Sequence, residues 1–87
     1  MMRQQATVSG VTADLVAELG KQIPVSTLPH VSTAEQAAAV IQTTVNALAQ
    51  DRYRRRGLPW TKVAGRVRYL RADVLKFLAD NRIGGDA

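Results

Sequence analysis

The chain has 87 residues, of which 46% are hydrophobic and none is cysteine, and its formal net charge is +5. This length suits about one small domain, and the lack of thiols excludes disulfide bonds and thiolate metal sites, so apolar packing has to stabilise the fold. No apolar run approaches the roughly 18 residues of a membrane span, and the sequence shows no signal-peptide pattern. We therefore expect a cytoplasmic protein with no membrane partner.

Basic residues gather in one part of the sequence. Residues 52–72 contain no Asp or Glu and hold eight of the 12 Lys and Arg residues, namely Arg52, Arg54, Arg55, Arg56, Lys62, Arg66, Arg68 and Arg71. Such clustering is typical of a surface that binds a polyanion, and the alternative is an ordinary solvated charged face. The charge distribution therefore favours an anionic macromolecule as partner.

Residues 1–29 are predicted to form a flexible lead-in, a short helix and a connector with two prolines. Residues 1–10 show no apolar periodicity, which favours a flexible segment. The helix is expected over 11–20, because Thr12 can cap its start and Gly20 stands just past its end.

The main module is predicted over 30–83, and its first helix should begin at a capping box formed by Ser32 and Glu35. One face of that helix is apolar and consists of Ala34, Ala37, Ala38 and Ile41. Val45, Leu48 and Ala49 continue the apolar positions beyond Gln42-Thr43-Thr44. Two interpretations stay open at this point, since either two helices separated by a turn or one long helix would show this periodicity.

A β-hairpin is predicted over 60–69, because apolar and polar residues alternate there after the stop at Gly57-Leu58-Pro59. A three-residue loop of Ala64, Gly65 and Arg66 would set the register. The resulting pairs are Val63 with Val67, Thr61 with Tyr69, and Lys62 with Arg68, which gives one apolar face and one basic face. Trp60 and Tyr69 are expected to be structural residues that anchor the hairpin.

The chain should close with a helix over 72–82, which has Asp73 in its first turn and an inward face of Val74, Leu75, Phe77 and Leu78. Residues 84–87, which begin with two glycines, are expected to be a mobile tail.

Several pieces of residues 32–81 carry a family resemblance. They are Glu35-Gln36-Ala37-Ala38, Gly57-Leu58-Pro59, Lys62-Val63-Ala64-Gly65-Arg66-Val67-Arg68-Tyr69 and Arg71-Ala72-Asp73-Val74-Leu75. In this order they resemble the excisionase and MerR-like DNA-binding domains. The resemblance favours the two-helix interpretation. It implies a mostly α fold with a small β-hairpin wing, a winged helix-turn-helix with an extra N-terminal helix.

In such a module the second helix enters the major groove of double-stranded DNA, and the hairpin contacts phosphates or the minor groove. Asn46 and Gln50 are then the expected base readers, since an amide pairs bidentately with adenine, and Arg66 is expected at the minor groove. The predicted DNA-binding residues are Thr44, Asn46, Gln50, Arg52, Tyr53, Arg54, Arg55, Arg56, Lys62, Arg66, Arg68 and Arg71.

The resemblance implies a phage or mobile-element excisionase, a recombination directionality factor that bends DNA and assists an integrase. Within DNA binding, the alternatives are a small MerR-like transcriptional regulator and a terminase small-subunit-like module. A helical protein-interaction scaffold is the alternative of a different class. We expect no enzyme, cofactor or metal, because no nucleophile, acid–base pair, phosphate loop or metal-ligand spacing is found in the sequence.

The predicted N-terminal helix carries an apolar stripe of Leu15, Val16 and Leu19. It is too short to form a stable isolated helix, so it should pack either on its own core or on a neighbouring protomer. The second alternative would support self-association on tandem DNA sites.

Overall fold

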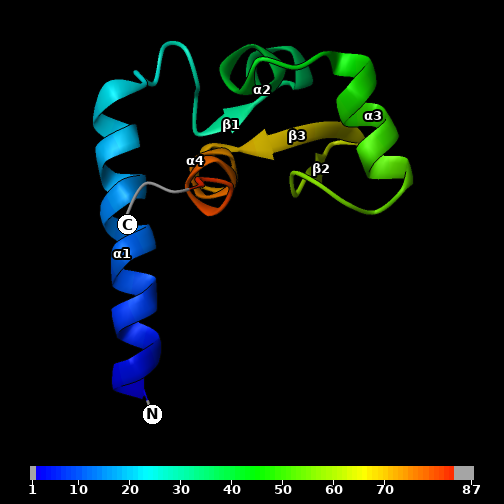
Figure 1. The fold of residues 1–87 in the computed structure, drawn as a ribbon. Coiled ribbons are helices and arrows are strands. Elements are labelled where there is room, and N and C mark those ends of the chain that lie inside the picture. Colours follow the sequence, from blue (N-terminus) through cyan, green and yellow to red (C-terminus); the bar gives the residue numbers. More distant parts are fainter. Residues whose placement is uncertain (1, 84–87) are drawn as a thin grey trace.

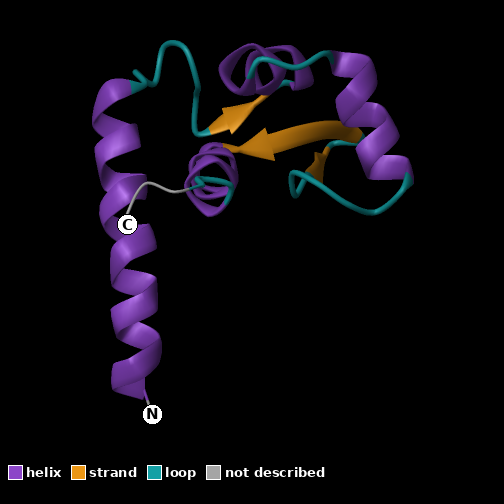
Figure 2. Cartoon of the chain, in the orientation of Figure 1, coloured by secondary structure: helices purple, strands orange, loops and turns teal. Residues whose placement is uncertain are grey.

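The computed structural model describes residues 2–83, with side chains described from Thr12 onward. Within that range the chain forms four helices and a three-stranded antiparallel sheet of order β1-β3-β2 (Figures 1 and 2). The elements are α1 (Met2–Gln22), β1 (Val31–Ser32), α2 (Ala34–Ile41), α3 (Val45–Tyr53), β2 (Thr61–Val63), β3 (Arg66–Leu70) and α4 (Arg71–Asp80). The predicted tail 84–87 lies outside the described residues.

The core lies where α2, α4 and β3 meet. Its buried apolar side chains are Leu28, Ala37, Ala38, Leu48, Leu58, Tyr69, Val74 and Leu75. On one side α1 packs along α4, and α3 lies at the opposite end of the molecule against α2 (Figure 1). The basic segment that follows α3 is therefore far from α1.

The first helix is longer than expected. It begins at Met2, so the flexible lead-in was a wrong prediction, and Thr12 lies inside the helix instead of capping it. Gly20 also lies inside α1, and a Cβ there would come within 3.6 Å of Leu75 Cδ1. At this distance an added methyl group would make ordinary contact, so Gly20 lies on the face of α1 that packs against α4, where the sequence suggested a helix end.

The apolar stripe of α1 packs on the protein's own core. Val16 and Leu19 contact the core cluster, as does Ile23 just after the helix, whereas Leu15 is half-buried. The first turns of α1 extend past the rest of the molecule (Figure 1). The side chains assigned to protomer contacts are therefore used mainly within the chain.

The break between α2 and α3 is confirmed. Gln42 adopts a left-handed conformation with φ of 59°, and its backbone N–H donates to the Ala38 carbonyl, which ends α2. Thr44 then caps α3, since its hydroxyl accepts from the Ala47 N–H at 3.0 Å. A three-residue turn thus separates two short helices.

The capping box of α2 lies one residue later than predicted. Thr33 is the N-cap, and its hydroxyl and the Gln36 side chain satisfy each other's backbone N–H groups. Ser32 is fully buried in β1 instead, where it pairs with Tyr69 and donates its hydroxyl to the Pro29 carbonyl at 2.7 Å. Ser32 therefore pairs with β3 and does not cap the helix that its position in the sequence predicted.

The hairpin has a shorter turn than predicted. Only Ala64 and Gly65 form the turn, both with positive φ (53° and 79°), as a type I′ turn requires. The pairs are therefore Thr61 with Arg68, Lys62 with Val67, and Val63 with Arg66. The register thus differs from the prediction by one residue. Because neighbouring residues of a strand point to opposite faces, each side chain of β2 lies on the face opposite to that of its predicted partner in β3.

The inward face of the last helix, α4, is largely as predicted. Val74 and Leu75 are buried, and Phe77 packs against the core from a half-buried position. The helix begins one residue earlier than expected, at Arg71, whose N–H donates to the His30 carbonyl. This bond ties the start of α4 to the connector that follows α1.

Candidate nucleic-acid interface

The second helix of the pair, α3, has distinct inner and outer faces. Leu48 is buried at 3% exposure, whereas Asn46, Gln50 and Tyr53 are exposed, Tyr53 at 89%. The inward position of Leu48 and the outward position of these three side chains are confirmed. Val45, which was expected to face inward, is 39% exposed because it occupies the first turn of the helix, away from the core.

A hydrogen bond anchors α3 to the central strand. Arg52 Nη1 donates to the Tyr69 hydroxyl at 2.6 Å, and Tyr69 is fully buried beside the core. The structural role predicted for Tyr69 is thus confirmed. Arg52 is half-buried and uses part of its donor set within the fold, although a guanidinium carries five N–H donors and keeps others for a ligand.

The C-terminal end of α3 forms a Schellman motif. The Arg56 N–H donates to the Asp51 carbonyl at 2.9 Å, and the Arg55 N–H donates to the Arg52 carbonyl at 3.0 Å. Arg55 occupies the left-handed position of this motif, with φ of 55°. Glycine is preferred there, because a residue with a Cβ costs about 1–2 kcal/mol in this conformation.

Past this motif the chain turns at Gly57, where φ is 83° and a Cβ would lie 2.9 Å from Asp51 Oδ2. The carboxylate of Asp51 in turn meets Arg56 Nε at 3.4 Å. This tight loop brings the arginines that follow α3 close to the residues that precede β2.

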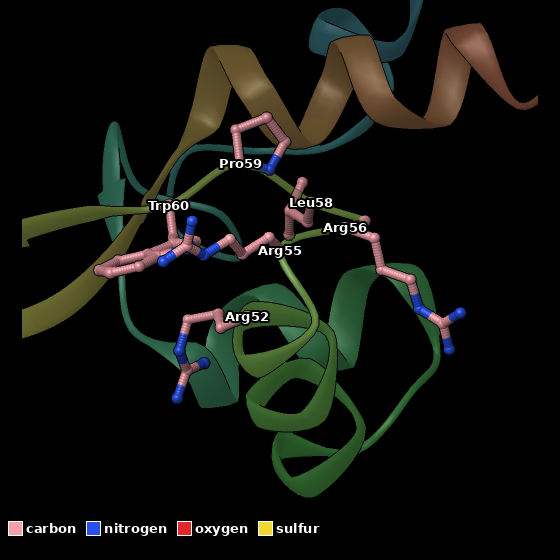
Figure 3. A pocket seen from close by; sticks show the side chains of 7 residues that line it. Arg52, Arg55, Arg56, Leu58, Pro59 and Trp60 are labelled. Atoms are coloured by element: carbon pink, nitrogen blue, oxygen red, sulfur yellow. The ribbon is translucent and has the colours of Figure 1, made fainter.

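The loop encloses an open hollow of about 440 Å³, which we call the Arg55–Trp60 hollow. It is lined by Arg52, Arg55, Arg56, Gly57, Leu58, Pro59 and Trp60. Arg55 extends toward the indole of Trp60, whereas Arg56 points to the other side of the loop (Figure 3). Trp60 is 43% exposed, so it does not occupy the buried anchoring position that the sequence predicted for it.

Cations stand on both faces of the hairpin. Side chains alternate along a strand, so Lys62 shares a face with Val67 and Tyr69, whereas Arg66 and Arg68 share the other. The predicted pair of Lys62 and Arg68 on one basic face is therefore wrong. Arg68 is half-buried and donates to the Val67 carbonyl at 2.7 Å.

Four cations of the predicted set have no partner within the part of the chain that the structure describes. They form neither a side-chain hydrogen bond nor an ion pair there, and all four are exposed: Arg54, Arg55, Lys62 and Arg66. Uncompensated exposed charge of one sign between α3 and the hairpin attracts anions. Thr44, by contrast, uses its hydroxyl as the cap of α3, although the residue itself is exposed.

Arg71 does not belong to this surface. It is 9% exposed, and its guanidinium donates to the carbonyls of Leu28 at 2.8 Å, Gly20 at 2.8 Å and Ile23 at 2.7 Å. It therefore joins α4 to the end of α1 and to the connector. The prediction that Arg71 contacts DNA is corrected, since its donors are used inside the fold.

Sequence reasoning missed the hollow, because its walls come from the loop after α3 rather than from one helix face. The signal that could have revealed it is the run Arg54-Arg55-Arg56-Gly57-Leu58-Pro59-Trp60, in which cations are followed at once by apolar groups and an aromatic ring. Such a run places charge and a flat apolar surface side by side.

In residues 2–83 no helix has both the length and the apolar character required to cross a lipid bilayer. Comparison of the chain with models of protein families, with curated proteins and with solved structures finds no match.

Proposed function

We propose that this protein binds double-stranded DNA in a sequence-specific manner, as a winged helix-turn-helix module. In this proposal α3 enters the major groove with Asn46 and Gln50 toward the base edges. The hairpin of β2 and β3 is the wing, with Arg66 at its tip directed toward the minor groove and Lys62 toward phosphates.

One observation carries this proposal. The face of α3 opposite Leu48 is exposed and polar, and it is continuous in sequence with exposed arginines that have no partner within the described chain. A helix with amides on its outer face and unpaired cations at its end supplies both kinds of contact that DNA recognition needs. Phosphate contacts orient the protein, and amides read bases.

The structure gives little support to the alternative that the protein is a helical scaffold for protein interactions. It required a continuous stripe from Ala34 to Leu48 that faces a partner helix. That stripe is interrupted at Gln42, and Ala37, Ala38 and Leu48 are buried in the chain's own core. These side chains are therefore not available as an interface between copies.

Duplex binding measured against salt concentration tests the proposal. If about four to six basic side chains meet phosphates, log affinity should fall against log salt with a slope of about −4 to −5. A random duplex at low salt should be retained weakly and a selected site tightly. A slope near zero, or no retention of any duplex, would overturn DNA binding.

Within DNA binding we propose the excisionase role, which rests on the resemblance of residues 32–81 to that family. An excisionase bends its site and acts with an integrase. Circularly permuted duplexes that carry a selected site should therefore migrate differently according to the position of the site. Uniform migration would favour a regulator that leaves its site straight.

A further inference from the structure

Arg55 holds a backbone conformation that disfavours it. Its φ of 55° is the left-handed position at which helices usually place glycine. Residues of this kind persist where the surroundings or a function require them, and they cluster at binding sites. No side-chain partner within the described residues accounts for the arginine, since its guanidinium makes no hydrogen bond or ion pair there.

The walls of the Arg55–Trp60 hollow differ in chemistry. Arg52, Arg55 and Arg56 are among its lining residues, and the Arg55 guanidinium extends toward Trp60, whereas that of Arg56 points away (Figure 3). Among the described residues the only carboxylate hydrogen-bonded to any of these arginines is Asp51, which is paired with Arg56. The remaining lining consists of the backbone of Gly57 and the apolar groups of Leu58, Pro59 and Trp60. The hollow thus carries uncompensated positive charge beside an apolar surface.

This combination fits one kind of ligand. A guanidinium group presents paired N–H donors that match the oxygens of a phosphate group. An indole ring beside it offers a flat apolar surface, and the Trp60 side chain is exposed and therefore accessible to a ligand. A phosphodiester with its attached sugar complements these two parts. Its anionic phosphate matches the guanidinium, and its largely apolar sugar matches the indole.

We infer that the Arg55–Trp60 hollow binds one nucleotide unit of a DNA strand. Arg55, assisted by Arg52, binds the backbone phosphate, and Trp60 packs against the adjoining deoxyribose. This inference rests on the proposed function. It adds a defined phosphate site to that function, and the site fixes α3 at its C-terminal end, so the positions of Asn46 and Gln50 along the groove follow from it.

The test compares Arg55→Gly with Arg54→Gln, a matched removal of charge at the preceding residue. Arg54 is exposed and does not line the hollow. Glycine suits the left-handed position, so Arg55→Gly should unfold at the same temperature as the wild type or at a higher one. A clearly lower unfolding temperature would show that Arg55 serves the fold, which overturns the inference.

Trp60 is the chain's single tryptophan and therefore reports on the hollow directly. With saturating duplex, acrylamide should quench Trp60 fluorescence less in the wild type and in Arg54→Gln. Arg55→Gly should lose this protection even when saturated with DNA, and its affinity should fall about ten-fold. Unchanged protection in Arg55→Gly overturns the site.

A scan of single methylphosphonate substitutions identifies the phosphate. One neutral linkage should weaken the wild type and Arg54→Gln about ten-fold yet have no further effect on Arg55→Gly, because both changes remove the same contact. If no linkage is coupled to Arg55 while the wild type still binds duplex, the hollow is not a phosphate site and DNA binding stands. If the wild type binds no duplex at all, both proposals fail.

Discussion

Arg52 and Tyr69 are 17 residues apart, and they meet through a 2.6 Å hydrogen bond that joins the outer helix α3 to the central strand β3. Apart from this bond the helix is held mainly by Leu48, which is its only buried residue among those that the structure describes. The hydroxyl of Tyr69 therefore does two things. It accepts one N–H of a half-buried guanidinium, and it helps to set the position of the helix that carries the proposed base readers.

Removal of that hydroxyl should affect both stability and binding. Tyr69→Phe leaves Arg52 without its partner, so we expect a loss of about 1–2 kcal/mol in the free energy of unfolding, measured by urea denaturation. Duplex affinity should also fall, because α3 becomes less well positioned. Tyr53→Phe is the matched control, as the Tyr53 ring is 89% exposed and should change stability by less than about 0.5 kcal/mol. Equal stability for the two variants would mean that the Arg52–Tyr69 bond contributes nothing.

Arg71 should matter for stability and not for DNA contact. Its guanidinium satisfies three carbonyls, those of Gly20, Ile23 and Leu28, from one buried position. The compact ammonium of Arg71→Lys cannot reproduce this planar set of donors, so we expect a loss of about 3 kcal/mol in the free energy of unfolding.

The matched control is Arg66→Lys, where the exposed side chain should change stability by less than about 0.5 kcal/mol. Duplex affinity of the folded Arg71→Lys fraction, measured at a temperature well below its unfolding midpoint, should equal that of the wild type. If Arg71→Lys were as stable as the wild type but bound DNA more weakly, Arg71 would contact DNA after all.

The case of Arg71 shows what the sequence does not reveal. In sequence it stands with the other arginines, so composition alone assigns it to the same charged surface. Only the fold brings it beside the end of α1 and the connector, where three carbonyls accept from it. By contrast, the outward position of Asn46 and Gln50 was predictable, since helical periodicity alone places them opposite Leu48.

The hairpin register was missed for a local reason. The predicted loop of Ala64, Gly65 and Arg66 came from the alternation of apolar and polar residues. Ala64 takes a left-handed conformation that alanine rarely adopts, so no residue type at that position indicated the two-residue turn. The end of α3 follows the same logic, as Arg55 stands where glycine is expected. Non-glycine residues with positive φ thus explain two features that the sequence did not reveal. They are the two-residue turn of the hairpin and the loop after α3 that lines the Arg55–Trp60 hollow.

That explanation gives a prediction about the turn. Asparagine tolerates a left-handed conformation, and Asn-Gly is the preferred pair in type I′ turns, so Ala64→Asn should raise the free energy of unfolding by about 0.5–1 kcal/mol. Gly65→Ala should lower it by about 1 kcal/mol, although a Cβ at Gly65 would meet no atom within 4 Å. Because no atom would clash with the added methyl group, that loss in the free energy of unfolding would come from backbone strain alone. Destabilisation by Ala64→Asn would argue against the two-residue turn.

Base readout and phosphate contact should separate on mutation of the proposed interface. Asn46→Ala or Gln50→Ala removes an exposed amide and no core contact, so folding should be unchanged. On a selected site each should cost about 1–3 kcal/mol of binding free energy, with little effect on random duplex. Arg66→Ala should weaken both duplexes alike and flatten the salt slope by about one, because Arg66 is an exposed cation with no partner in the described chain. Anisotropy titrations at several salt concentrations measure both quantities. Equal weakening on selected and random duplexes for the amide variants would show that a different face of the protein reads the bases, since Asn46 and Gln50 would then bind DNA without regard to its sequence.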